Sequence, residues 1–116
     1  EELRQIVIDV LKGYNKSSYE FVVKEQYRNM GEVLAKNPNI ISHALEAITR
    51  TGLKPVLDSI RGGTDGSRFS FMGLPTANIF AGEHGIHSKQ EWVSTQDMQK
   101  ATETIVHLVS IWEENS

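Results

Sequence analysis

The sequence predicts an α/β protein, and three patterns lead to this prediction. From residue 53 onward, strand-like segments alternate with helix-like segments. That order of elements is typical of helices packed on a sheet. The first 30 residues differ, because an amphipathic helical pattern leads into one segment of strand-like alternation. A single helix and a single strand do not bury their own apolar faces, so these two elements need sheet partners.

The N-terminal part of the chain begins with a predicted helix. Apolar side chains recur at helical spacing from Leu3 to Tyr14, and Gly13 marks the end of the helix. Aromatic and apolar residues then recur at every second position over 19–29, which predicts a strand. A single turn of helix is expected over 30–36.

A second long helix is expected to begin at Pro38. Asn37 has the position of an N-cap, and proline is favoured at the first helical residue. Gly52 is the expected residue just past the helix end. The side chains expected to form its buried stripe are Ile40, Ile41, Ala44, Leu45 and Ile48.

The next part of the chain is expected to alternate between strand and helix. Residues 54–60 predict a strand, and 61–66 predict a glycine-rich turn. A short helix is expected over 67–72, followed by a buried strand over 77–81. Residues 82–93 have the character of a loop, which carries two histidines.

The last element is a predicted helix with an N-cap at Ser94. Asp97 lies in its first turn, where a carboxylate suits the positive helix end. The side chains expected to face the core are Met98, Ala101, Ile105, Leu108, Val109 and Trp112.

Composition excludes several classes of protein. The 116 residues are 39% hydrophobic and 23% charged, which is ordinary for one globular domain. The net charge of −3 with no basic cluster argues against nucleic acid as a partner. No apolar run approaches the roughly 18 residues of a membrane span. The absence of cysteine excludes disulfides and thiolate metal sites, and it fits a reducing cytoplasm.

The stretch Arg61-Gly-Gly-Thr-Asp-Gly-Ser67 has the most unusual composition. Its glycines let the backbone approach a ligand closely, and successive free N–H groups bind anions. The alternative interpretation is a tight turn that requires positive φ. The spacing matches neither the Walker loop nor the Rossmann fingerprint.

His84 and His87 follow a predicted buried strand, where α/β proteins place ligands. A neutral imidazole there is a good zinc ligand. The other interpretation is a surface loop with two ordinary histidines. Asn29 ends the first strand, where it either holds a polar group of a substrate or is solvated.

Taken together, these motifs resemble the tripeptide aminopeptidases of the M20 zinc metallopeptidase family. The resemblance is densest where Ile60–Ser67 precedes Phe71–Pro75 and Asn78–Phe80, and it continues through Gly82, His87, Glu91 and Val93. The stretch Tyr27–Met30 is similar to the junction at which the lid domain of the family returns to the catalytic domain.

The resemblance implies a C-terminal fragment of a two-domain enzyme. Residues 1–29 correspond to the last helix and strand of a ferredoxin-like lid. Residues 30–116 correspond to the C-terminal part of the zinc-peptidase catalytic α/β domain. The sheet partners of this N-terminal helix and strand are then expected to lie in the upstream part of the polypeptide.

The family also implies the roles of individual residues. His87 matches its last metal ligand, in an enzyme that binds two zinc ions. Arg61, Gly62, Gly63 and Thr64 match the segment that contacts the far end of the substrate, and Asn29 matches a lid-junction residue. The remaining metal ligands and the general base lie upstream in the family. This segment alone is therefore expected to be inactive and to contain no catalytic residue.

The resemblance implies that the substrates are small peptides and that the enzyme works in the cytoplasm. It implies neither nucleic acid nor a membrane as a partner, and it is compatible with a homo-oligomer. Two alternatives stay open. One is another M20 hydrolase, either a dipeptidase or an amide deacylase. The other is a non-catalytic binding or dimerisation module.

Overall fold

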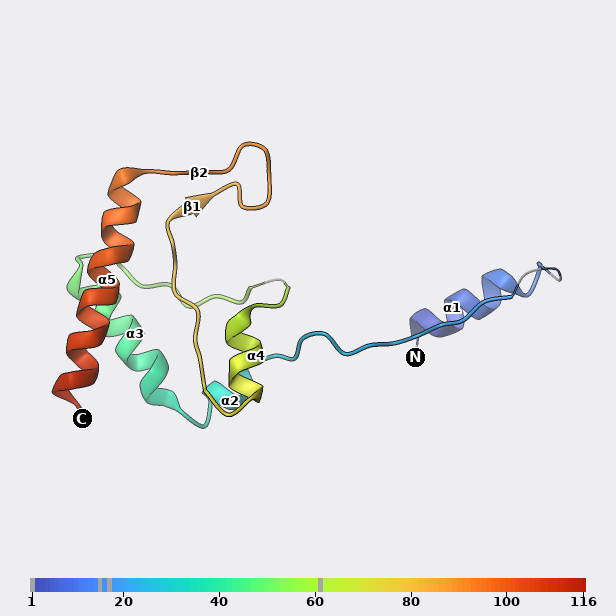
Figure 1. Cartoon of the computed structure of the whole chain (residues 1–116), viewed down its shortest axis with the longest axis horizontal. Helices are drawn as coiled ribbons and strands as arrows, with labels where there is room; N and C mark the ends of the chain where they lie inside the picture. Colours follow the sequence, from blue (N-terminus) through green and yellow to red (C-terminus); the bar gives the residue numbers. More distant parts are fainter. Residues whose placement is uncertain (1, 15, 17, 61) are drawn as a thin grey trace.

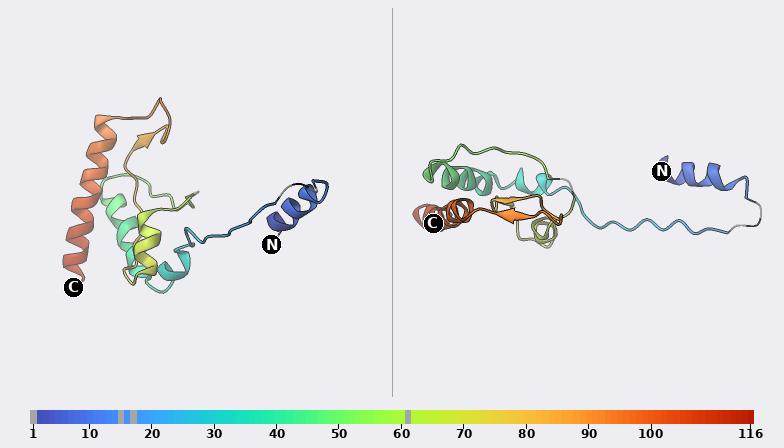
Figure 2. Two further views of the ribbon diagram at one scale, coloured as in Figure 1. Left: turned by 45° about the vertical axis from the view of Figure 1, so that its right-hand side comes forward. Right: turned by 90° about the horizontal axis from the view of Figure 1, so that it is seen from above.

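The computed structural model describes residues 2–14, 16, 18–60 and 62–116. In chain order, the elements of these residues are α1 (Glu2–Leu11), α2 (Gly31–Leu34), α3 (Pro38–Arg50), α4 (Asp65–Phe71), β1 (Glu83–His84), β2 (Trp92–Val93) and α5 (Thr95–Glu114). Elements α2 to α5 form one body, and α1 lies far from it at the end of an extended segment (Figure 1). Figure 2 shows the same separation from two further directions. The chain is therefore elongated, with extents of 66 × 37 × 19 Å.

The predicted first helix is confirmed as α1, but it has no buried residue. Its apolar side chains Leu3, Ile6 and Val10 are all exposed. Residues 19–29 run extended, as Figure 1 shows, but they pair with no other strand among the described residues. The segment is therefore extended but is not a regular strand, because a strand needs a neighbour to bond its N–H and C=O groups. That its sheet partners lie upstream stays a prediction.

The short helix α2 and the long helix α3 occur where the sequence predicts them. Pro38 is the first residue of α3, but the Asn37 side chain makes no capping hydrogen bond. Its Nδ2 instead donates to the carbonyl of Val33, 2.9 Å away. Thr51 is the C-cap and Gly52 follows with φ +82°, the left-handed conformation that glycine tolerates.

The hydrophobic core lies where α3 packs on α5. Ala47 of α3 and both Ile111 and Thr104 of α5 are fully buried. The Thr104 hydroxyl is satisfied within its own helix by donating to the Lys100 carbonyl at 2.9 Å. The ring of His43 packs edge-on against Trp112, with centroids 4.6 Å apart.

The stripe predicted for α5 is only partly buried. Ala101 and Leu108 are half-buried, whereas Met98, Ile105, Val109 and Trp112 are exposed. The prediction is wrong for these four because α3 packs against one side of α5, the side of Thr104 and Ile111. The capping prediction for α5 is confirmed, since the Ser94 Oγ accepts from the backbone N–H of Asp97 at 3.0 Å.

The described residues form one sheet, and it has two strands. β1 pairs antiparallel with β2, with Glu83 opposite Val93 and His84 opposite Trp92. This hairpin lies inside the segment 82–93, for which the sequence predicts a loop, so that prediction is wrong at these four residues. The predicted strands 54–60 and 77–81 have no regular secondary structure, because no described strand lies beside them to complete a ladder. Helices with a small sheet are compatible with the α/β class.

Helix α4 begins two residues before its predicted start at Ser67. Thr64 is its N-cap, with extended backbone, and the Thr64 side chain accepts from the N–H of Ser67. The predicted stop is confirmed, because Gly73 follows the helix with φ +98°. The N–H of Leu74 then bonds the carbonyl of Phe69 at 2.9 Å, which closes the helix end.

Candidate functional site

The extended segment 19–29 meets the body of the molecule at α4. The hydroxyl of Ser67 donates to the backbone carbonyl of Arg28 at 2.6 Å. The Arg28 guanidinium lies 4.4 Å from the centre of the Phe71 ring, and that of Arg68 lies 5.8 Å from the centre of the Tyr27 ring. Both distances are within the range of cation–π attraction. One hydrogen bond and two ring contacts therefore hold residues 27 and 28 on α4.

A cleft of about 860 Å³ opens beside this junction. Its walls come from residues 24–31, 57–60, 62–64 and 77–78, with further contributions from α2, α3 and α4. Four residues predicted to bind substrate line it together: Asn29, Gly62, Gly63 and Thr64. The fifth, Arg61, lies outside the described residues. The structure thus brings Asn29 and residues 62–64 to one cleft, and their binding role stays a prediction.

Glycine is required at positions 62 and 63 of the turn for two different structural reasons. Gly62 has φ +100°, a conformation that other residues rarely adopt. Gly63 lies directly against Tyr27, so that a Cβ at this position would overlap the Tyr27 ring. The turn therefore needs glycine at both positions, one for its backbone conformation and the other for close packing.

Asn29 has a local role in the cleft. Its Oδ1 accepts from the N–H of Gly31 at 2.8 Å, so the side chain is folded over the start of α2. The Oδ1 atom is thereby engaged in a hydrogen bond within the protein. The Nδ2 group is the part of Asn29 that remains to donate to a ligand.

Asn78 is a cleft residue to which the sequence analysis gave no role. Its Nδ2 donates to the Thr64 Oγ1 at 3.1 Å, which joins the segment 77–81 to the glycine-rich turn. A Cβ at Gly66 would lie 2.9 Å from the Asn78 Oδ1, so glycine leaves room for the amide. The only signal in the sequence was the place of Asn78 in the Asn-Ile-Phe motif.

His87 lies in the loop between β1 and β2, away from the residues that line the cleft. Among the described residues it is the one non-glycine residue with positive φ, 64°. The Glu91 Oε2 accepts from its backbone N–H at 2.8 Å. The imidazole is exposed to solvent.

The described part of the chain contains no group of three or more His, Cys, Asp or Glu side chains that could hold a metal ion. Zinc takes three or four protein ligands, so His87 does not fit a zinc ion by itself. His84, the other histidine of the hairpin, stacks on Trp92 with centroids 4.3 Å apart, and its Nε2 lies 3.5 Å from the Asp97 Oδ2. These contacts give His84 a structural role, tying the hairpin to α5.

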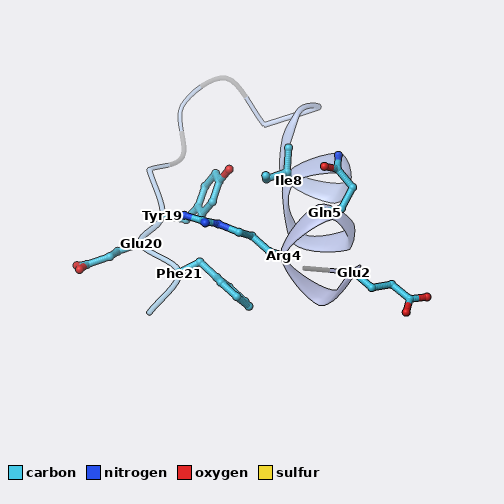
Figure 3. Close-up of a pocket in the computed structure, with 7 residues that line it drawn as sticks. All are labelled: Glu2, Arg4, Gln5, Ile8, Tyr19, Glu20 and Phe21. Carbon is cyan, nitrogen blue, oxygen red and sulfur yellow. The ribbon is translucent and has the colours of Figure 1, made fainter. Parts of the chain in front are cut away.

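A second hollow, of about 950 Å³, lies between α1 and the start of the extended segment. Figure 3 shows the Arg4 side chain reaching from α1 toward Tyr19, with Phe21 below it. None of the residues that line this hollow is a predicted site residue.

The family of this chain follows from comparison with known sequences. The sequence model of Peptidase family M20/M25/M40 matches residues 7–111, and the chain belongs to this family. No described helix is long and apolar enough to cross a membrane.

Among the similar proteins are three that bear the name Peptidase T. The protein from Fusobacterium nucleatum is 42% identical over 96% of this chain. Those from Caldanaerobacter subterraneus and Ligilactobacillus salivarius are each 44% identical, over 97% and 96% of the chain. The chain spans only 27–28% of the length of these relatives.

Proposed function

We propose that this chain is the C-terminal segment of a zinc-dependent aminopeptidase that releases the N-terminal residue of tripeptides. The family and the name Peptidase T of its relatives support a peptidase. The observation that carries the assignment of the site is the convergence of Asn29 with residues 62–64 on one cleft. We assign residues 1–29 to the end of a lid domain and 30–116 to the catalytic domain.

The cleft binds the C-terminal carboxylate of the peptide. Arg61 supplies a guanidinium, whose planar fork suits a carboxylate. Gly62 and Gly63 leave backbone N–H groups accessible to the same anion, and Thr64 supplies a hydroxyl. This end of a tripeptide lies far from the bond that an aminopeptidase cuts, so the cleft orients the substrate and takes no part in bond cleavage.

His87 is one ligand of a zinc pair in the whole protein. His87 would help to hold the metal there, and the chemistry that zinc would supply is activation of a water for peptide hydrolysis. Such a pair needs several ligands and a general base, and His87 is the one ligand that the resemblance to the family assigns to this segment. The other ligands and the base therefore belong to another part of the polypeptide. On its own, the 116-residue chain binds peptide weakly and does not hydrolyse it. The lack of cysteine supports a cytoplasmic location for the enzyme.

The test is a substrate comparison with the whole zinc-loaded protein. We expect hydrolysis of tripeptides from the N-terminus, with dipeptides and N-acyl amino acids cut much more slowly. Preferred cleavage of dipeptides or acylated amino acids would assign the protein to another activity of the same family. No turnover of any of the three classes would identify a binding or dimerisation module instead.

A further inference from the structure

Among the described residues, the Thr64 hydroxyl accepts two hydrogen bonds and donates none. A threonine hydroxyl has two acceptor lone pairs and one donor hydrogen. The N–H of Ser67 donates to the Thr64 Oγ1 at 3.3 Å, and the Asn78 Nδ2 donates to the same oxygen at 3.1 Å. Both acceptor positions are therefore occupied, and the hydroxyl hydrogen is left to donate.

No described residue accepts that hydrogen, and Thr64 lines the cleft in a half-buried position. A ligand oxygen entering the cleft meets a hydroxyl whose lone pairs are engaged. The hydroxyl therefore acts as a donor only. A carboxylate oxygen, which is a pure acceptor, is the matching group on a peptide.

We propose that Asn78 is a positioning residue that acts through Thr64, holding the hydroxyl as a donor to the C-terminal carboxylate of the substrate. This inference rests on the proposed function of the cleft. The close fit between Gly66 and the Asn78 Oδ1 limits where the amide can lie. Asn78 therefore shapes selectivity for peptides with a free C-terminus, without touching the peptide itself.

The test is a double-mutant cycle in the whole protein, measured on free and C-terminally amidated tripeptides. Thr64→Val removes the donor and should lower kcat/KM for free peptides by about tenfold, mostly through KM. Asn78→Ala should cause a smaller loss of the same kind. In the Thr64→Val background, Asn78→Ala should have no further effect. Amidated peptides should respond little to any of these changes.

Two variants separate positioning from structural damage. Thr64→Ser keeps both the hydroxyl and the helix cap, so this variant, unlike Thr64→Val, should retain the wild-type selectivity for peptides with a free C-terminus. Asn78→Asp replaces the amide donor by an acceptor that takes the hydroxyl hydrogen, so it should lower kcat/KM on free peptides more than Asn78→Ala does. Thr76→Val is the matched control, because the Thr76 hydroxyl donates to the Leu74 carbonyl and does not line the cleft. It should behave as wild type.

The outcomes distinguish this inference from the proposed function. Additive losses from Thr64→Val and Asn78→Ala, or equal losses on free and amidated peptides, would overturn the role of Asn78 while tripeptides are still hydrolysed. If the wild-type protein hydrolyses no tripeptide, the proposed function itself is wrong. Thermal unfolding of each variant shows whether a loss comes from misfolding.

Discussion

The hydroxyl of Ser67 donates to the backbone carbonyl of Arg28 at 2.6 Å, although the two residues are 39 positions apart. Ser67 is buried, with 6% of its surface exposed. This bond fixes the end of the extended segment on α4, at the edge of the cleft. The junction between the two proposed domains is thus held by one specific polar contact together with the ring contacts of Tyr27 and Phe71.

Ser67→Ala should loosen this junction. The substitution leaves the Arg28 carbonyl without its donor, which typically costs about 1–3 kcal/mol when the group stays buried. We expect faster amide hydrogen exchange over residues 27–31 in the whole protein. Ser110→Ala is the control, because the Ser110 hydroxyl bonds only the Val106 carbonyl on the exposed side of α5. Unchanged exchange over 27–31 in the Ser67 variant would show that the ring contacts alone hold the segment.

The loss of kcat/KM caused by Arg61→Ala should depend on whether the tripeptide has a free C-terminal carboxylate. Loss of a charge-assisted contact costs about 1.5–3 kcal/mol, roughly ten- to 150-fold in kcat/KM. We expect that loss on tripeptides with a free carboxylate and a much smaller one on amidated tripeptides. If Arg61 only braces the turn, both substrates lose activity equally and the protein melts at a lower temperature.

His87→Ala should abolish most activity of the whole protein and lower its zinc content. The reason is that zinc loses one of its few protein ligands. Metal analysis of the purified variant measures the second effect independently of turnover. Turnover at the wild-type level with two bound zinc ions contradicts this assignment. For the isolated chain, calorimetry should detect no tight zinc binding.

The pairing of Arg50 with Glu114 should make stability depend on pH. The guanidinium lies 2.8 and 3.1 Å from the two Glu114 carboxylate oxygens, which lowers the pKa of Glu114 and raises that of Arg50. Because the pKa of Glu114 is lower in the folded state, the pair stabilises the fold above the ordinary glutamate pKa, about 4.3. The contribution is lost as pH falls through the depressed value. It is small because both groups contact solvent.

Glu114→Gln tests this dependence through thermal unfolding at two pH values. At pH 7 the variant should melt slightly below wild type, and the difference between the two melting temperatures should shrink as the pH falls below the ordinary glutamate pKa of about 4.3. Glu113→Gln is the matched control, since no salt bridge of Glu113 occurs in the described chain. A constant difference between wild type and the Glu114 variant at both pH values contradicts the ion pair as its cause.

Local signals in the sequence determined the positions of the helices and several of their ends. The start of α3 at Pro38, its stop at Gly52, the cap of α5 at Ser94 and the stop of α4 at Gly73 all lie where the sequence predicts them. Each depends on residues within about one helical turn, because capping and glycine turns are short-range interactions. The family motifs are local in the same way, and the family that they indicate is the one that matches.

Only the tertiary structure decided the rest. Strand-like alternation over 19–29 predicts an extended chain, but a sheet needs a second strand, and none among the described residues lies beside it. Likewise, the period of α5 marks its apolar positions, but the packing of α3 selects which of them are buried. The contacts of Thr64 with Asn78 and of Ser67 with Arg28 join residues 14 and 39 positions apart. No periodicity specifies such pairs, because they form only when distant segments fold against each other.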